Sequence, residues 1–102
     1  MEKYGLIGGL KAAPGKAAEL VAILTSAADL MRKADGCLLY LVGFAAEDDH
    51  LVEIVEVWDS KEDHDASLSF PGVKELIAEA MPLLDGSPEK GIEIRITGGH
   101  GL

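Results

Sequence analysis

The side chains best suited to chemistry are two acid–base groups and two aromatic rings. Glu56 and Trp58 are two residues apart, so they share one face of an extended strand. His64 follows within a segment of helical character, and Tyr40 lies in an earlier apolar segment. A carboxylate or imidazole set among aromatic and apolar side chains can exchange a proton with a small aromatic molecule.

Each of these residues also has a purely structural interpretation, which the sequence leaves open. His64 precedes Leu68 by about one helical turn, which predicts an inward-facing base; the alternative is a half-exposed helix histidine. Glu56 is an acid on an otherwise apolar strand face, so its burial requires a partner or a raised pKa. It could instead bond to Tyr40 or to the backbone across the sheet. Trp58 could stack on an aromatic substrate or anchor the core, and Tyr40 has the same two interpretations.

The other histidines and the single cysteine do not predict a further site. His50 lies in an acidic turn and is expected to be exposed. His100 lies in a glycine-rich tail, which we expect to be a mobile end, although it could fold over a pocket or a partner. Cys37 begins an apolar segment and is expected to be a buried thiol. We therefore expect no metal site, no phosphate-binding loop and no Ser/His/Asp nucleophile.

Charge and hydropathy exclude several classes of partner. The chain of 102 residues has 18 acidic against 9 basic residues, and the resulting net charge of −9 opposes binding to nucleic acid or to an anionic membrane. The longest apolar run, residues 37–42, is too short to span a bilayer, and the N-terminus lacks the layout of a signal peptide. We therefore expect one domain over residues 1–102, in a soluble cytoplasmic protein.

Hydrophobic periodicity predicts the element order β-α-β-β-α-β. The expected elements are strands at 3–11, 37–44, 50–58 and 91–97, a helix at 16–33, and a helical region at 60–81 that Pro71-Gly72 divides. Ser60 followed by Asp63 predicts a helix cap, and Pro71 could be the first residue of the second helical piece. This order is typical of an α+β, ferredoxin-like fold with an antiparallel four-stranded sheet.

The predicted helices cannot cover all of the predicted apolar surface. Two helical segments cover one face of such a sheet, yet the strands at 37–44 and 50–58 are apolar on both faces. The alternation predicts that Cys37, Leu39 and Leu41 share one face and that Ile92, Ile94 and Ile96 point into the core. Because the second face needs a cover, we expect a homodimer with the sheets packed face to face.

Three short motifs occur in a fixed order along the chain. They are Lys11 with Pro14-Gly15-Lys16, Gly36-Cys37 with Tyr40, and Glu56, Trp58, Ser60 and Glu62 in the pattern E-x-W-x-S-x-E. Together they resemble the motifs of the antibiotic biosynthesis monooxygenase family, and the resemblance runs from about Tyr4 to Thr97. It implies a dimeric α/β barrel with one pocket per subunit, between the helices and the sheet.

The resemblance also implies an activity and the residues that carry it. Characterised relatives oxidise quinols or polycyclic phenols with O₂ and use no metal, flavin or haem, so no cofactor is expected. The expected partners are a small aromatic molecule, O₂ and a second copy of the chain. Such chemistry needs a base, a snug apolar pocket and exclusion of water. The corresponding residues are His64 or Glu56 as the base and Trp58, Tyr40, Leu68 and Phe70 as substrate-binding side chains.

The chain also departs from the family pattern, and these departures keep other functions open. Many members have a histidine at the position of Ser67, and some have an asparagine at the position of Ile54. The chain contains no asparagine at all, which disfavours the haem-degrading branch of the superfamily. The alternatives are a non-catalytic, stress-related or regulatory barrel that binds a small hydrophobic molecule, and an isomerase or decarboxylase on the same fold.

Overall fold

The computed structural model describes residues 2–102 and has the element order that the hydrophobic periodicity predicts. The elements are β1 (Lys3–Lys11), α1 (Ala17–Met31), β2 (Cys37–Ala45), β3 (Asp48–Trp58), α2 (Lys61–Ser67), α3 (Val73–Ala80), the 3₁₀ turn η1 (Met81–Leu83) and β4 (Ile92–Ile96). The second helical region is divided into α2 and α3, as expected from its Pro-Gly pair. None of the helices within residues 2–102 has the length and apolarity needed to cross a membrane.

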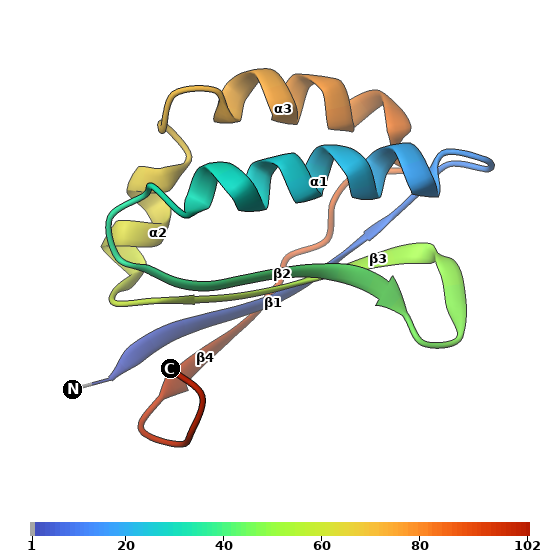
Figure 1. The fold of residues 1–102 in the computed structure, drawn as a ribbon. Helices are drawn as coiled ribbons and strands as arrows, with labels where there is room; N and C mark the ends of the chain where they lie inside the picture. The colour runs from blue at the N-terminus through green and yellow to red at the C-terminus, as the bar shows by residue number, and fades with distance from the viewer. Residues whose placement is uncertain (1) are drawn as a thin grey trace.

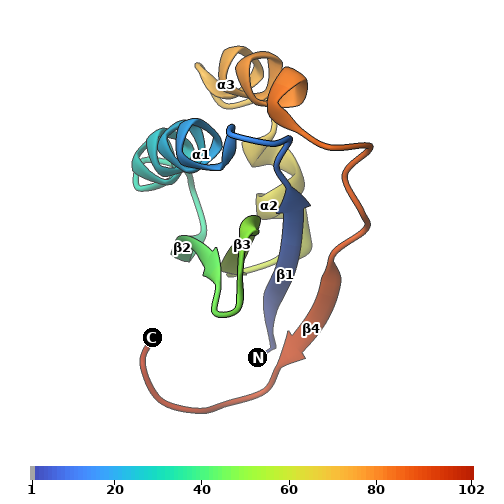
Figure 2. The ribbon, with the colours of Figure 1, turned by 90° about the vertical axis from the view of Figure 1, so that its right-hand side faces the viewer.

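The strands form one antiparallel sheet in the order β2-β3-β1-β4. Helices α1 and α3 pack side by side over one face of the sheet, and α2 lies at the end of this layer, close to the end of β3 (Figure 1). The C-terminal tail turns back beneath the opposite face, which none of the helices in residues 2–102 covers (Figure 2). The predicted ferredoxin-like α+β fold is confirmed, with a sheet that remains open.

Helix α1 forms because its apolar residues recur along one side, and Leu20, Leu24 and Met31 are buried there. The chain then turns at Gly36, whose φ of 81° lies in the left-handed region that glycine tolerates best. A Cβ atom at this position would collide with the carboxyl group of Asp63. Gly36 therefore allows the chain entering β2 to pass close to the start of α2, the helix that carries His64.

Two apolar clusters hold the helices on the sheet. One lies under α1 and α3, around the buried residues Leu24 and Val52. The other surrounds Trp58 and Val73, with Phe70 packed against it. Trp58 is fully buried, so its replacement by alanine should destabilise the fold by about 3–5 kcal/mol. Residues of both clusters also border the cavity described below.

A bulge in β2 changes the face that Cys37 occupies. The register with β3 shifts between Cys37 and Leu39, which places Cys37 opposite Trp58 and against the helical core. The prediction that Cys37 shares a face with Leu39 and Leu41 is wrong, because the extra residue Leu38 interrupts the alternation. The thiol is only partly buried, and this burial raises its pKa.

Strand β4 directs its isoleucines away from the helices. Its register places Glu93 opposite Leu6, so the acidic side chain lies on the helical face of the sheet. The prediction that Ile92, Ile94 and Ile96 point into the core is wrong, and Ile92 is 66% exposed. Alternation shows which side chains share a face, but it does not show which face a helix covers.

Among the element boundaries that differ from those predicted, the starts of β3 and α3 have a local explanation. Strand β3 begins at Asp48, so the turn before it shrinks to residues 46–47 and His50 lies within the strand. Helix α3 begins at Val73, after Gly72 with a φ of 95°, so Pro71 is not its first residue. The left-handed glycine places the start of the helix two residues later than the proline rule suggests.

The uncovered face of the sheet is apolar. The pairing register places Leu41 opposite Val55 and Leu39 opposite Val57 on this face, and Leu41 is 55% exposed. The C-terminal residues 97–102 border a hollow of about 550 Å³ at one end of the same face, together with Leu39, Val57 and Ile96. The tail therefore lies along part of the face and leaves the β2–β3 surface around Leu41 accessible.

Candidate functional site

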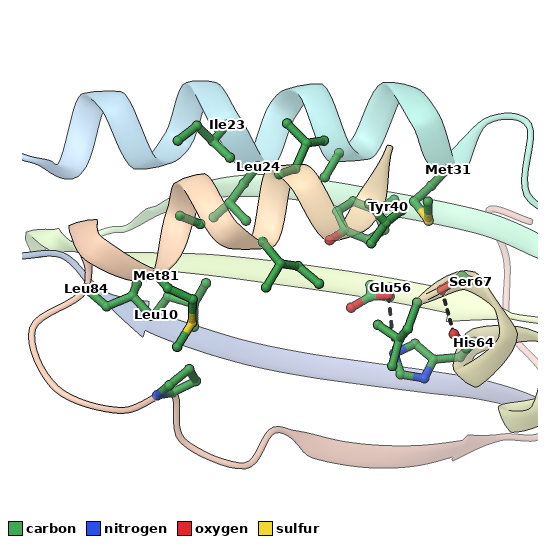
Figure 3. A pocket seen from close by; sticks show the side chains of 17 residues that line it. Leu10, Ile23, Leu24, Met31, Tyr40, Glu56, His64, Ser67, Met81 and Leu84 are labelled. Atoms are coloured by element: carbon green, nitrogen blue, oxygen red, sulfur yellow. Dashed lines mark hydrogen bonds and ion pairs between the residues drawn. The ribbon is translucent and has the colours of Figure 1, made fainter. Parts of the chain in front are cut away.

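A cavity of about 240 Å³ lies between the sheet and helices α1, α2 and α3 (Figure 3). Of the 17 side chains that line it, only those of Tyr40, Glu56, His64 and Ser67 contain nitrogen or oxygen atoms. None of the lining residues is a lysine or arginine. The cavity is therefore an apolar space with one small group of polar atoms, as is usual for sites that bind small organic molecules.

The polar and apolar linings are separated along the cavity. Glu56, His64 and Ser67 lie together near α2, and we call this the polar end (Figure 3). Leu10, Met81 and Leu84 lie together at the other side, near η1, and we call this the apolar end. A molecule that fills the cavity would therefore have its polar group beside α2 and its hydrocarbon part beneath α3.

Glu56 is held at the polar end by the pleat of β3. Its neighbours in the sheet are Leu6 of β1 and Tyr40 of β2, and its side chain points toward the helices. One carboxylate oxygen accepts a hydrogen bond of 3.0 Å from Nε1 of Trp58. Burial raises the pKa of the Glu56 carboxyl, and this effect outweighs the Trp58 indole and the His64 imidazole, which both lower it.

His64 reaches the cavity because of the way α2 begins. Ser60 caps the helix by accepting a hydrogen bond of 3.1 Å from the backbone N–H of Asp63, as the sequence predicts. The next residue, His64, has a side chain that is 15% exposed, and its ring packs 5.4 Å from the ring of Tyr4 and 5.8 Å from that of Trp58. The imidazole is thus enclosed by aromatic surfaces rather than exposed on the helix.

Glu56 and His64 approach each other across the polar end. The distance from Oε1 of Glu56 to Nε2 of His64 is 3.8 Å, longer than a direct hydrogen bond. A hydroxyl group placed between them could contact both atoms. On its other side, Nδ1 of His64 lies 3.0 Å from Oδ1 of Asp65. When Nδ1 carries the proton it donates to Asp65, and Nε2 remains an acceptor that faces Glu56.

Tyr40 completes the polar end from the neighbouring strand. It lines the cavity and lies directly opposite Glu56 in the register of β2 and β3. Burial raises the pKa of the Tyr40 phenol, and the nearby Glu56 raises it further. The hydroxyl is therefore protonated and available as a donor to an oxygen atom in the cavity.

The structure brings only some of the expected site residues to the cavity. Tyr40, Leu68, Glu56 and His64 line it. Trp58 is fully buried behind Glu56, so the predicted stacking of a substrate on its ring is wrong. Phe70 packs against the cluster around Trp58 and does not line the cavity, which corrects its predicted substrate-binding role. Both aromatic rings belong to the apolar cluster that packs next to the cavity.

Two residues at the site were missed in the sequence. Asp65 directly follows His64, so an acid adjacent to a candidate base was a signal that could have found it. Tyr4 lies in the strand predicted at residues 3–11, but nothing in the sequence indicates its pairing with Trp58 or its contact with His64. Burial and the hydrogen bond to Glu93, at 2.8 Å, raise the pKa of Tyr4 to about 12.

The remaining histidines lie away from the cavity. His50 is an exposed residue of β3, with Nδ1 3.7 Å from Oδ1 of Asp48. His100 belongs to the tail on the opposite face of the sheet. Within residues 2–102, no group of three or more His, Cys, Asp and Glu side chains is arranged to hold a metal ion.

Comparison with known proteins assigns the chain to a family. A protein from Chloroflexus aurantiacus J-10-fl that carries the name of the antibiotic biosynthesis monooxygenases is 42% identical, with a TM-score of 0.86 and 97% of each chain covered. A Deinococcus radiodurans protein of the same family name is 28% identical, with a TM-score of 0.74 over 97% of this chain and 95% of that chain.

A conserved protein from Methanosarcina mazei Go1 shares the fold, with 21% identity, a TM-score of 0.85 and 95% of each chain covered. No functionally curated protein matches the sequence. The family model for antibiotic biosynthesis monooxygenases matches residues 4–79, from β1 to the last turn of α3. The chain therefore belongs to the antibiotic biosynthesis monooxygenase family.

Proposed function

We propose that this protein is a cofactor-independent monooxygenase that oxidises a small phenol or quinol with O₂. The observation that carries the proposal is the partly buried pair of Glu56 and His64 at the polar end of an otherwise apolar cavity. Family membership supports the reaction class. A cavity of about 240 Å³ favours a small aromatic ring system, because sites for drug-sized ligands usually begin at about 300 Å³.

In the proposed reaction, the substrate hydroxyl lies between Oε1 of Glu56 and Nε2 of His64, and its proton passes to one of these bases. Tyr40 donates a hydrogen bond to the resulting oxyanion, and the apolar walls exclude water from it. The electron-rich anion reduces O₂ and forms a carbon–oxygen bond at the ring, which gives a hydroperoxide after proton transfer. Cleavage of the O–O bond leaves one oxygen atom on the product quinone and releases the other as water. All the electrons come from the substrate.

The test is O₂ uptake by the pure, chelator-treated protein with a panel of hydroquinones and hydroxylated anthrones. We expect uptake above the uncatalysed rate, unchanged by chelator. Glu56→Gln and His64→Gln should each lower kcat/KM by about 100-fold or more if both groups handle the proton. His50→Gln is the matched control, because His50 is exposed and lies outside the cavity. Failure of the whole panel to consume O₂ would favour ligand binding without turnover, or another reaction on this fold.

We also propose that the protein acts as a homodimer through the uncovered face of the sheet. The face exposes Leu41 and Ile92, and contiguous apolar surfaces of this kind are uncommon on monomers. Stable interfaces bury about 800 Å² on each partner, which a four-stranded face of this composition can supply. Sedimentation analysis over a range of concentrations tests this proposal, and a monomer at every concentration would refute it.

A further inference from the structure

The apolar end of the cavity has a lining that the proton chemistry at Glu56 and His64 does not use. Leu10, Met81 and Leu84 enclose this end, and Met81 is nevertheless 49% exposed. Ile77 also lines the cavity and is 45% exposed. Side chains that both line the cavity and contact solvent form an apolar rim, so the cavity opens to solvent beside α3 and η1.

The charge of the lining limits what can occupy this end. No lysine or arginine lines the cavity, and its only ionisable lining groups are Tyr40, Glu56 and His64, away from the apolar end. An anionic group at Leu10 and Leu84 would lose its hydration without gaining a cationic partner, which is strongly unfavourable. The Glu56 carboxylate and the chain's net charge of −9 add repulsion.

We infer that the apolar end, formed by Leu10, Met81 and Leu84, is a subsite for an uncharged apolar substituent of the substrate, and that it discriminates against substrates with an anionic group at that position. The inference rests on the proposed function only for the hydroxyl group at the polar end. A fitting substrate is a one- or two-ring phenol or hydroquinone with a short hydrocarbon chain remote from the reacting hydroxyl. Met81, at the rim, is the residue expected to determine this specificity.

Binding can be measured without turnover. The chain contains a single tryptophan, and the indole of Trp58 is hydrogen-bonded to Glu56, so its fluorescence should report occupancy of the polar end. Phenol, 4-propylphenol and 4-hydroxyphenylacetate are suitable probes, because they share one hydroxyl group and differ only in the remote substituent. Since each buried methylene tightens binding by up to about fourfold, 4-propylphenol should bind at least about tenfold more tightly than phenol. The acetate should bind no more tightly than phenol. Equal affinities for all three probes would overturn the inference.

A pair of lysine variants locates the effect at the apolar end. Met81→Lys places a cation at the rim, whereas Ala78→Lys places the same charge on an exposed residue of α3 that does not line the cavity. Met81→Lys should weaken the binding of 4-propylphenol and tighten the binding of 4-hydroxyphenylacetate, so that the ratio of their affinities changes by about 100-fold. Ala78→Lys should leave that ratio within about twofold. Equal changes in both variants would show a general charge effect and refute the subsite.

The binding assay and the O₂ assay separate the two proposals. If no hydroquinone supports O₂ uptake but the probe preferences hold, the subsite stands and the oxygenase reaction is refuted. If O₂ is consumed while propyl- and carboxymethyl-substituted hydroquinones react with equal kcat/KM, the reaction stands and the subsite is refuted.

Discussion

The partly buried carboxyl group of Glu56 should make the protein less stable as the pH rises, and Glu56→Gln should remove this loss of stability. Burial raises the pKa of Glu56 in the folded protein above its ordinary value of 4.5. In the window above 4.5 the unfolded chain therefore releases its proton first, and the folded state binds more protons than the unfolded state. The free energy of unfolding consequently falls as pH rises through this window, and it stops falling above the folded pKa.

The size of the stability loss follows directly from the shift in the pKa of Glu56. Each unit by which the folded pKa exceeds 4.5 costs about 1.4 kcal/mol of stability at a pH above both values. A glutamine at this position keeps the shape of the side chain and can still accept the hydrogen bond from Nε1 of Trp58. Near the lower end of the window the two proteins should differ by less than about 0.5 kcal/mol. With increasing pH the variant should become the more stable protein, until the difference reaches a plateau.

The assay is urea unfolding followed by Trp58 fluorescence, between about pH 5 and about pH 9. Glu79→Gln, on the exposed surface of α3, corrects for removing one negative charge from a chain of net charge −9. Repeating the comparison in a His64→Gln background should enlarge the plateau, because the imidazole lowers the pKa of Glu56. The reasoning would be refuted if the difference in free energy of unfolding were constant over the whole pH range. It would also be refuted if the wild type became more stable relative to the variant as the pH rises.

Three further predictions concern the surroundings of the site. Gly36→Ala should destabilise the protein by about 2 kcal/mol or more, because it combines a positive φ with a collision at Asp63. Gly15→Ala is the control, since Gly15 has a similar φ but open space around it, and it should cost only about 1 kcal/mol in the same urea assay. Asp65→Ala should lower kcat about tenfold at unchanged KM, since it removes the partner of Nδ1 of His64 without altering the cavity wall. A fall in thermal stability with no change in kcat would assign Asp65 a structural role alone. Leu41→Glu should shift sedimentation from dimer to monomer, whereas Ala18→Glu on the exposed side of α1 should not; a dimer retained by both variants would place the interface elsewhere.

The element order could be predicted from the sequence because each element carries a local signal. The 3.6-residue spacing of apolar side chains in α1 and the left-handed Gly36 after it are features of adjacent residues. The orientation of β4 could not be predicted, since it depends on which side of the sheet the helices occupy. The bulge between Cys37 and Leu39 was also missed, because it is a property of the pairing with β3 rather than of β2 alone.

The distinction between local signals and contacts set by the sheet also explains which site residues could be predicted. Glu56 and His64 could be proposed from residue type and spacing, because both lie in one short strand–turn–helix segment. The expected stacking surface on Trp58 was wrong, since a strand pattern does not show how deeply a ring is covered. Tyr4 was missed because its position beside His64 depends on the β1–β3 register, which joins segments more than fifty residues apart.

The E-x-W-x-S pattern has a physical explanation in this structure. The two-residue spacing of Glu56 and Trp58 places both side chains on the helical face of β3, where the buried indole N–H can reach the carboxylate. Ser60 then caps α2 and fixes its first turn, from which His64 projects toward the same carboxylate at 3.8 Å. The motif therefore builds a partly buried carboxylate, its hydrogen-bond donor and the start of the helix that supplies His64. On this account Trp58→Phe should preserve the packing but raise the pKa of Glu56 further. The pH-dependent loss of stability should then be larger than in the wild type, with unfolding of both proteins followed by circular dichroism because the variant has no tryptophan. A smaller loss in Trp58→Phe would show that the indole does not stabilise the carboxylate, and the explanation of the motif would fail.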